Sequence, residues 1–193
     1  MKLISKPGCM ELSMVAEAAW GWNYILQKGF ALDGVSGTSV RGFLHDALGF
    51  DDGFIDSTVR TIFLNNSPVD DLDRTYIKDG DRMGLGSAMP GLVGIVMGRD
   101  NFYKSFRSGI EIKDHSRAQA SPARVSMKVF STLAAETGRG LLARGILVDA
   151  GVLAEFLRDR KAQILSADGL DAEGFLARLE TMTGDVSIRV IFA

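Results

Sequence analysis

Two predicted strands and the sharp turns that bound them, between residues 59 and 88, constrain the fold more than any other part of the chain. Residues 59–64 are rich in β-branched and aromatic side chains, which favour a strand. The pair Asn65–Asn66 ends this strand, because Asn tolerates the left-handed backbone angles of a tight turn. The pair Asp79–Gly80 marks a second turn, and residues 82–88 follow it as the next strand. This order predicts a small sheet.

The segment before these strands has clear signals for the start and the end of a helix. Thr38 or Ser39 can cap the first free amides, and Gly49 stops the helix. The apolar residues between them recur at spacings of three and four, which is typical of a helix that packs on one face. These residues are Val40, Phe43, Leu44, Ala47 and Leu48. We expect this helix to pack across a mixed sheet.

The N-terminal segment is less regular. Residues 1–5 and 30–34 each predict a short strand. Residues 11–28 carry an apolar stripe with helical spacing, which favours a helix, although residues 22–26 also fit a strand. The stripe consists of Leu12, Val15, Ala19, Trp22 and Leu26.

The second half combines strands and amphipathic helices. Residues 125–129 and 186–192 alternate between apolar and polar side chains, which is typical of half-buried strands. Residues 152–164 and 170–179 have the pattern of amphipathic helices, and Asp149 can cap the first of them. The fold class is therefore predicted as α+β, with a helix-rich α+β second half.

These elements suggest three parts. We predict a first domain over residues 1–107, a linker or exposed loop over residues 108–123 and an α+β C-terminal domain over residues 124–193. The alternative is one continuous domain that shares one sheet, in which the strand at 186–192 pairs with the N-terminal strand. A chain of 193 residues can bury a core in either arrangement.

Residues 37–94 resemble the ubiquitin-like β-grasp sulfur carriers of thiamine and molybdopterin synthesis. The resemblance lies in Thr38-Ser-Val-Arg-Gly-Phe-Leu, in Ile62-Phe-Leu-Asn-Asn-Ser-Pro-Val-Asp and in Lys78-Asp-Gly-Asp-Arg-Met-Gly-Leu. It implies a β-grasp core over about residues 30–94. Sulfur carriers of this family act through a free C-terminal Gly-Gly, whose carboxylate is converted to a thiocarboxylate. Here the corresponding place reads Met89-Pro-Gly-Leu-Val-Gly94 and the chain continues, so a carrier function requires cleavage near Gly94.

We predict that the chain is a non-catalytic protein-interaction module. β-grasp domains resemble one another in exposing a sheet face and strand edges, which suit the docking of a protein partner. The segment predicted to bind a partner combines apolar side chains with a constrained backbone, and consists of Met89, Pro90, Gly91, Leu92, Val93 and Gly94. The alternative is that this segment is a buried hinge into the second half, and burial of Leu92 and Val93 would indicate it.

The sequence contains no recognisable catalytic or metal-binding pattern. Cys9 is the only cysteine, which excludes an intrachain disulfide and a cysteine zinc site. His45 is expected on a solvated helix face, and His115 lies in the loop-like stretch. The acidic residues between 70 and 81 lack the spacing of a calcium loop. We therefore predict no cofactor and no metal, and a binding protein rather than an enzyme.

Residues 99–107 mix basic and aromatic side chains. This pattern fits the binding of a single-stranded nucleic acid. It also arises where aromatic rings are buried while basic side chains extend to water. The net charge of −2 and the interleaved acidic residues favour the second interpretation, and we predict no nucleic-acid partner.

Localisation and association complete the predictions. No leader pattern is present and no apolar run approaches about 18 residues, so we expect a cytoplasmic protein with no membrane partner. Ile191 lies on the otherwise polar face of the last predicted strand, with Ser187 and Arg189. It either contacts a second copy, which gives a homodimer, or packs under a helix of its own chain.

Overall fold

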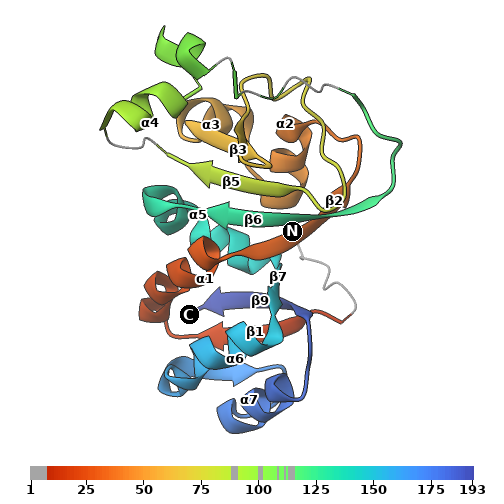
Figure 1. The fold of residues 1–193 in the computed structure, drawn as a ribbon. Coiled ribbons are helices and arrows are strands. Elements are labelled where there is room, and N and C mark those ends of the chain that lie inside the picture. Colours follow the sequence, from red (N-terminus) through yellow and green to blue (C-terminus); the bar gives the residue numbers. More distant parts are fainter. Residues whose placement is uncertain (1–7, 88–90, 100–101, 108, 111, 113–115) are drawn as a thin grey trace. The chain divides into compact units, whose positions relative to one another are not determined.

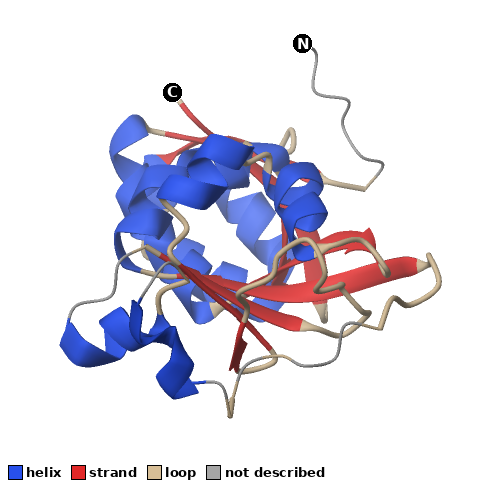
Figure 2. Ribbon diagram, turned by 90° about the horizontal axis from the view of Figure 1, so that it is seen from above, coloured by secondary structure: helices blue, strands red, loops and turns tan. Residues whose placement is uncertain are grey.

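The computed structural model describes residues 8–87, 91–99, 102–107, 109–110, 112 and 116–193. Helices and strands both contribute to it, as Figure 2 shows, so the predicted α+β class is confirmed. The chain divides into two compact units. Unit 1 comprises Met1–Ile25 and Ala135–Ala193, and unit 2 comprises Leu26–Ala134. Unit 2 is therefore inserted into the sequence of unit 1, and this division differs from the predicted ranges 1–107 and 124–193.

Five strands of unit 2 pair in a mixed arrangement (Figure 1). They are β2 (Phe30–Val35), β3 (Thr61–Leu64), β4 (Ser67–Pro68), β5 (Arg82–Gly86) and β6 (Pro122–Val129), in the order β4-β3-β5-β6-β2. β5 and β6 are parallel, and the other pairs are antiparallel. The strand predicted over residues 125–129 thus lies in unit 2.

The predicted capped helix is present as α2 (Val40–Phe43), continued by the π-helical turn η2 (Leu44–Leu48). The Ser39 hydroxyl accepts a hydrogen bond from the Gly42 amide at 3.1 Å, and Gly49 ends the helix with a φ of 76°. Phe43 packs on β2 at Gly34, where a Cβ would come within 2.8 Å of the ring. A residue without a side chain therefore allows the helix to approach the sheet.

The two predicted turns are also confirmed. Asn65 and Asn66 both have positive φ values, 51° and 69°, and Gly80 has a φ of 80°. The Asn65 amide group donates to Asp81 at 2.8 Å, and the Asn65 side-chain oxygen accepts from the Arg82 amide at 2.9 Å. These bonds connect the two turns, which fixes β3 beside β5.

Three further helices lie wholly within the described part of unit 2, and the sequence pattern did not predict them. They are α3 (Asp52–Ser57), α4 (Gly91–Met97) and the 3₁₀ helix η3 (Phe102–Arg107). The Asp51 carboxylate caps α3 by accepting from the Phe54 amide at 2.8 Å. Helices α4 and η3 lie within the long connection between the parallel strands β5 and β6.

Unit 1 has its own strands, β1 (Met10–Met14), β7 (Ile146–Asp149), β8 (Ile164–Ala167) and β9 (Asp185–Phe192). Their order is β7-β9-β1-β8, and β1 and β9 run parallel. The last strand therefore pairs with an N-terminal strand, although that strand is residues 10–14. The strand predicted over residues 1–5 falls outside the described residues.

The helices of unit 1 match the sequence prediction in the C-terminal part. α6 (Ala150–Arg158) has the predicted cap, because Asp149 accepts from the Val152 amide at 3.0 Å. α7 (Ala172–Glu180) corresponds to the second predicted amphipathic helix. The remaining helical segments are η1 (Ala16–Trp22), α1 (Asn23–Lys28), α5 (Ser131–Arg144) and η4 (Lys161–Gln163), of which α1 and α5 each cross the boundary between the two units.

The continuous helix over residues 11–28 is wrong at its start, because Leu12 lies in β1 opposite Val190 of β9. Ile191 is 46% exposed, so it does not pack under a helix of its own chain. The homodimer remains a prediction. Within the described residues, no helix has both the length and the apolar character needed to cross a membrane.

Candidate functional site

The segment predicted to bind a partner begins outside the described residues and continues into α4. Met89 and Pro90 are not described, nor are the side chains of Leu92 and Val93. Gly91 is exposed and starts α4 with a φ of 80°, whereas Gly94 is buried within the helix. β5 ends at Gly86, before this segment begins, and residues 91–94 form the first turn of α4.

Three exposed aromatic side chains follow α4, on helix η3. Phe102 is 93% exposed and Phe106 79% exposed, and Tyr103 between them is about half exposed. The Tyr103 ring lies 5.6 Å from that of Phe102 and 6.1 Å from that of Phe106, between ring centroids. We call Phe102, Tyr103 and Phe106 the aromatic platform. Contiguous exposed rings of this kind mark binding surfaces more often than single exposed apolar residues do.

Arg107 connects the platform helix η3 to the neighbouring parts of unit 2. Its side chain is fully buried and forms an ion pair with Asp70, in the segment after β4. Its guanidinium also donates to the backbone oxygens of Met97 at 2.9 Å and Gly98 at 3.2 Å. One arginine therefore joins η3, the end of α4 and the Asp70 segment.

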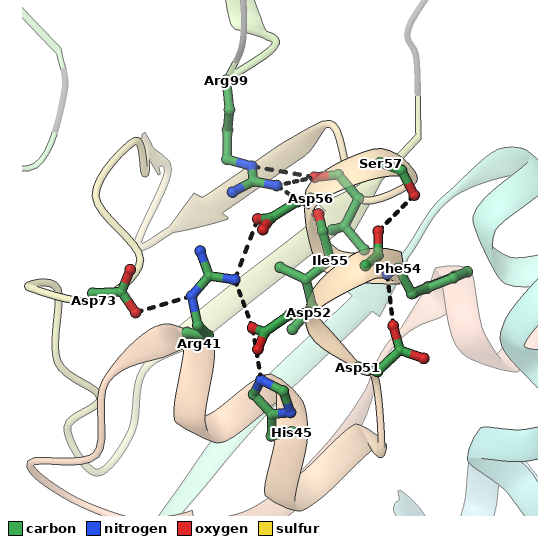
Figure 3. A network of polar contacts seen from close by, with 12 residues as sticks. Arg41, His45, Asp51, Asp52, Phe54, Ile55, Asp56, Ser57, Asp73 and Arg99 are labelled. Carbon is green, nitrogen blue, oxygen red and sulfur yellow. Dashed lines mark hydrogen bonds and ion pairs between the residues drawn. The ribbon is translucent and has the colours of Figure 1, made fainter.

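Arg99 forms a second anchor. Its guanidinium donates to the backbone oxygen of Ile55 at 2.6 Å and to that of Val59 at 2.9 Å. Its own amide donates to the oxygen of Arg60 at 2.8 Å. These carbonyls lie at the carboxyl end of α3 and just beyond it, where helical carbonyls lack partners within the helix and favour a cation. Figure 3 shows Arg99 reaching the end of α3.

The predicted arrangement of residues 99–107 is therefore reversed. The expected burial of the rings and exposure of the basic groups is wrong, because the rings are exposed and both arginines are buried. The guanidinium groups of Arg99 and Arg107 are bonded to protein oxygens and cannot reach a phosphate backbone. The absence of a nucleic-acid partner stays a prediction.

A second polar feature surrounds Arg41, on α2. Figure 3 shows its guanidinium among three carboxylates. Its Nε donates to Asp73 at 2.9 Å. Its Nη1 donates to Asp52 at 2.9 Å and to Asp56 at 3.2 Å. We call Asp52, Asp56 and Asp73 the acidic cluster. Each of these side chains is more than half exposed.

The electrostatics of this cluster follow from its hydrogen bonds. Partial burial opposes the charge of Arg41, but hydrogen bonds to Asp73, Asp52 and Asp56 outweigh it and raise the pKa of the guanidinium. His45 also bonds Asp52, at 3.1 Å. This bond, followed by the bond from Arg41, holds the pKa of Asp52 below its ordinary value of 3.8.

The lowered pKa of Asp52 predicts a pH-dependent stability. A carboxyl whose folded pKa lies below its unfolded value stabilises the fold above the unfolded pKa, and the effect disappears as the pH falls through the folded pKa. We expect Asp52→Asn to be less stable than the wild type at about pH 5. The difference should shrink as the pH falls below 3.8. Urea unfolding across this range measures it, and a difference that grows in acid would contradict the prediction.

The other candidate residues from the sequence lie in separate surroundings. Among the described residues, no three His, Cys, Asp or Glu side chains are grouped so that they could hold a metal ion. His45 pairs with Asp52 on the surface at 3.1 Å. His115 lies outside the described residues. The acidic residues between 70 and 81 serve separate structural contacts, for example Asp70 with Arg107 and Asp81 with Asn65.

The chain matches no protein-family model, no curated protein and no solved structure. A function is therefore proposed from the geometry of the described residues. The sequence pattern predicts a partner-binding segment at residues 89–94, and it did not predict the aromatic platform. A usable signal was present, because Phe102, Tyr103 and Phe106 recur at spacings of three and four on one short helix.

Proposed function

We propose that unit 2 is a β-grasp domain whose strands occur in permuted order along the chain. A β-grasp sheet is mixed, and its first and last strands run parallel to each other at the centre. In unit 2 the parallel central pair is β5 and β6, and β2 lies antiparallel beside β6. α2 follows β2 directly, as the helix follows the first hairpin in a β-grasp fold. In this proposal β6 takes the place of the first strand although it comes last.

We further propose that the chain is a non-catalytic protein-interaction module, in which the aromatic platform binds a protein partner. The observation that carries this proposal is the exposure of Phe102 and Phe106 on a helix held by buried arginines. Aromatic side chains dominate the binding energy of protein interfaces, because they bury a large apolar area with few rotatable bonds. The expectation of a cytoplasmic location belongs to the same proposal.

The anchors of the platform strengthen this reading. Arg99 and Arg107 bond the segment on both sides of the platform to carbonyls and to a carboxylate of unit 2. Binding therefore need not order a flexible loop, which reduces the entropy lost on association. Exposed rings held in this way differ from isolated apolar residues on an ordinary surface.

A photocrosslinking amino acid at Phe106 tests the proposal. We expect full-length protein with this substitution to form one discrete crosslinked product with another protein in its native cells. Leu165, an exposed apolar residue of unit 1, serves as the control position. The additional change Phe102→Ser should reduce the yield at least about fivefold, since a central aromatic contributes more than 1 kcal/mol to binding. If the crosslinker gives the same products at positions 106 and 165, or gives none at position 106, the proposal is wrong.

The sulfur carrier that matures by cleavage near Gly94 is the second candidate. Gly94 is buried in α4, and its carbonyl accepts a hydrogen bond from the Gly98 amide at 3.0 Å. A protease would first have to unfold this helix, so we rank this candidate below the interaction module. The intact mass of protein from its native cell decides, because a product ending at Gly94 would reverse the order.

A further inference from the structure

We infer that the partner segment bound by the aromatic platform is a basic amphipathic stretch of protein, with an apolar face for the platform and Lys or Arg side chains for the acidic cluster. This inference rests on the proposed function and adds the chemistry of the partner. It depends on two features of unit 2, namely the distance between the two surfaces and the charge that remains on the acidic cluster.

The two surfaces are neighbours because the same contacts anchor both. Arg99 is bonded to the oxygen of Ile55, the residue before Asp56 of the acidic cluster. Phe102, the first ring of the platform, comes three residues after Arg99. Three residues span at most about 10 Å, so the platform begins close to the end of α3 that carries Asp56.

A second connection has the same effect. Arg107, at the end of the platform helix, is paired with Asp70. Asp73 of the acidic cluster follows Asp70 by three residues. The platform is thus joined to the cluster through α3 on one side and through the residues after β4 on the other.

The acidic cluster retains negative charge after its internal pairing. Three carboxylates share the guanidinium of Arg41, and all three are more than half exposed. Asp70 adds no charge, since Arg107 compensates it. A basic side chain of a partner would therefore meet uncompensated carboxylates beside the rings. Such complementarity favours basic partners and disfavours acidic ones by like-charge repulsion.

A short helix suits this combination of surfaces. An amphipathic helix of about 14 residues is about 21 Å long and presents an apolar face and a charged face over that length. Helices of this kind bind apolar surfaces through residues that recur every three or four positions. Their opposite face carries the charges, so one segment satisfies both surfaces.

Binding of a designed peptide pair tests the inference on the full-length protein. One peptide is a helix of Leu and Lys of about 14 residues, and the other has Glu at every Lys position, with a fluorophore on each. We expect the Leu/Lys peptide to bind at least about tenfold more tightly than the Leu/Glu peptide, with an affinity that falls as salt rises. Fluorescence anisotropy measures both. Equal affinities for the two peptides would overturn the inference.

Matched variants assign the binding to the two surfaces. The double variant Phe102→Ser, Phe106→Ser should bind the Leu/Lys peptide about tenfold less tightly or worse. The double variant Asp56→Asn, Asp73→Asn should also lower the affinity for this peptide and reduce the salt dependence of binding. Both Asp residues are exposed, and Asp52 stays on Arg41, so the fold should persist and circular dichroism should not change.

A control variant separates local from net charge. Glu155→Gln with Asp159→Asn, in unit 1, changes the net charge by the same amount at exposed positions outside the acidic cluster. We expect it to leave peptide binding unchanged. If this control variant lowers the affinity for the Leu/Lys peptide as much as the changes at Asp56 and Asp73 do, non-specific electrostatic attraction explains the binding. The inference then fails.

Other occupants of the platform give different results. Sedimentation with phosphatidylglycerol vesicles that depends on Phe102 would identify a lipid surface, and self-association that depends on Phe106 would identify a second copy. Either result overturns the inference.

The crosslink at position 106 distinguishes a failure of this inference from a failure of the proposed function. If the native crosslink forms but the protein does not prefer the basic peptide, the interaction module stands and the basic chemistry is wrong. If no crosslink forms, the proposed function itself fails.

Discussion

Asp70→Asn is expected to destabilise unit 2 by about 3 kcal/mol, because it leaves the charge of Arg107 buried without a counter-ion. The Arg107 side chain is fully buried, and its other hydrogen-bond partners are the neutral carbonyls of Met97 and Gly98. Its Nε is buried with no hydrogen-bond partner among the described residues. Nothing else described beside this guanidinium carries a negative charge that could replace Asp70.

The loss of stability should be concentrated in α4 and η3, within residues 91–107. Because Arg107 joins η3 to the residues after β4, the platform helix and α4 should open before the sheet does. Hydrogen exchange of the α4 amides then reports the local loss, and urea unfolding reports the global one. A fall in protection confined to residues 91–107 would fit the anchoring role of Arg107.

A neighbouring carboxylate provides the control. Asp71 is exposed and accepts from the Arg74 amide at 2.9 Å, so Asp71→Asn should cost about 1 kcal/mol or less. Arg107→Met together with Asp70→Asn should be more stable than Asp70→Asn alone, because no unpaired charge is then buried. If Asp70→Asn is no more harmful than Asp71→Asn, the ion pair does not anchor the platform.

Local signals explain which elements could be predicted from the sequence. The helix at residues 40–48 has its cap at Ser39 and its stop at Gly49, and both act within one turn. The turn at Asn65 needs only a residue that tolerates positive φ. The alternating pattern of residues 186–192 likewise predicts β9, since one face of that strand is buried.

The missed elements depend on partners far along the chain. Leu12 has helical spacing to its neighbours, yet it pairs with Val190 in a parallel ladder, and this non-local pairing overrides the local pattern. Gly91–Met97 is a short apolar run, for which periodicity does not separate helix from strand.

The candidate site was hidden for the same reason. The burial of Arg107 follows from Asp70, which lies 37 residues away, and that of Arg99 from Ile55, which lies 44 residues away. Residues 99–107 alone cannot show that the arginines point inward and the rings outward. The acidic cluster also forms only in the fold, because Asp73 reaches Arg41 from 32 residues away.

Gly37→Ala is expected to destabilise unit 2 by about 3 kcal/mol, from the strain of a positive φ and from a clash with the backbone. Gly37 follows β2 with a φ of 78°, and an added Cβ would overlap the backbone oxygen of Ala118. The turn cannot easily move away, since the Gly37 amide donates to the oxygen of Ile77 at 2.8 Å. The Arg117 side chain donates to the Gly37 oxygen at 2.9 Å. The segment around Ala118 must therefore shift.

Gly80→Ala provides a matched control, because it has nearly the same backbone strain without the clash. Gly80 has a φ of 80°, and a Cβ there would meet nothing within 4 Å. We expect it to cost about 1–2 kcal/mol, which is the strain of a left-handed residue alone. Urea unfolding gives the free energy of unfolding of both variants, and the difference between them measures the clash with Ala118. Trypsin cleavage after Arg117 should also become faster in Gly37→Ala only, as the contact with residue 37 is lost. Equal stabilities and equal cleavage rates in the two variants would show that residues 117–118 do not pack on the turn after β2.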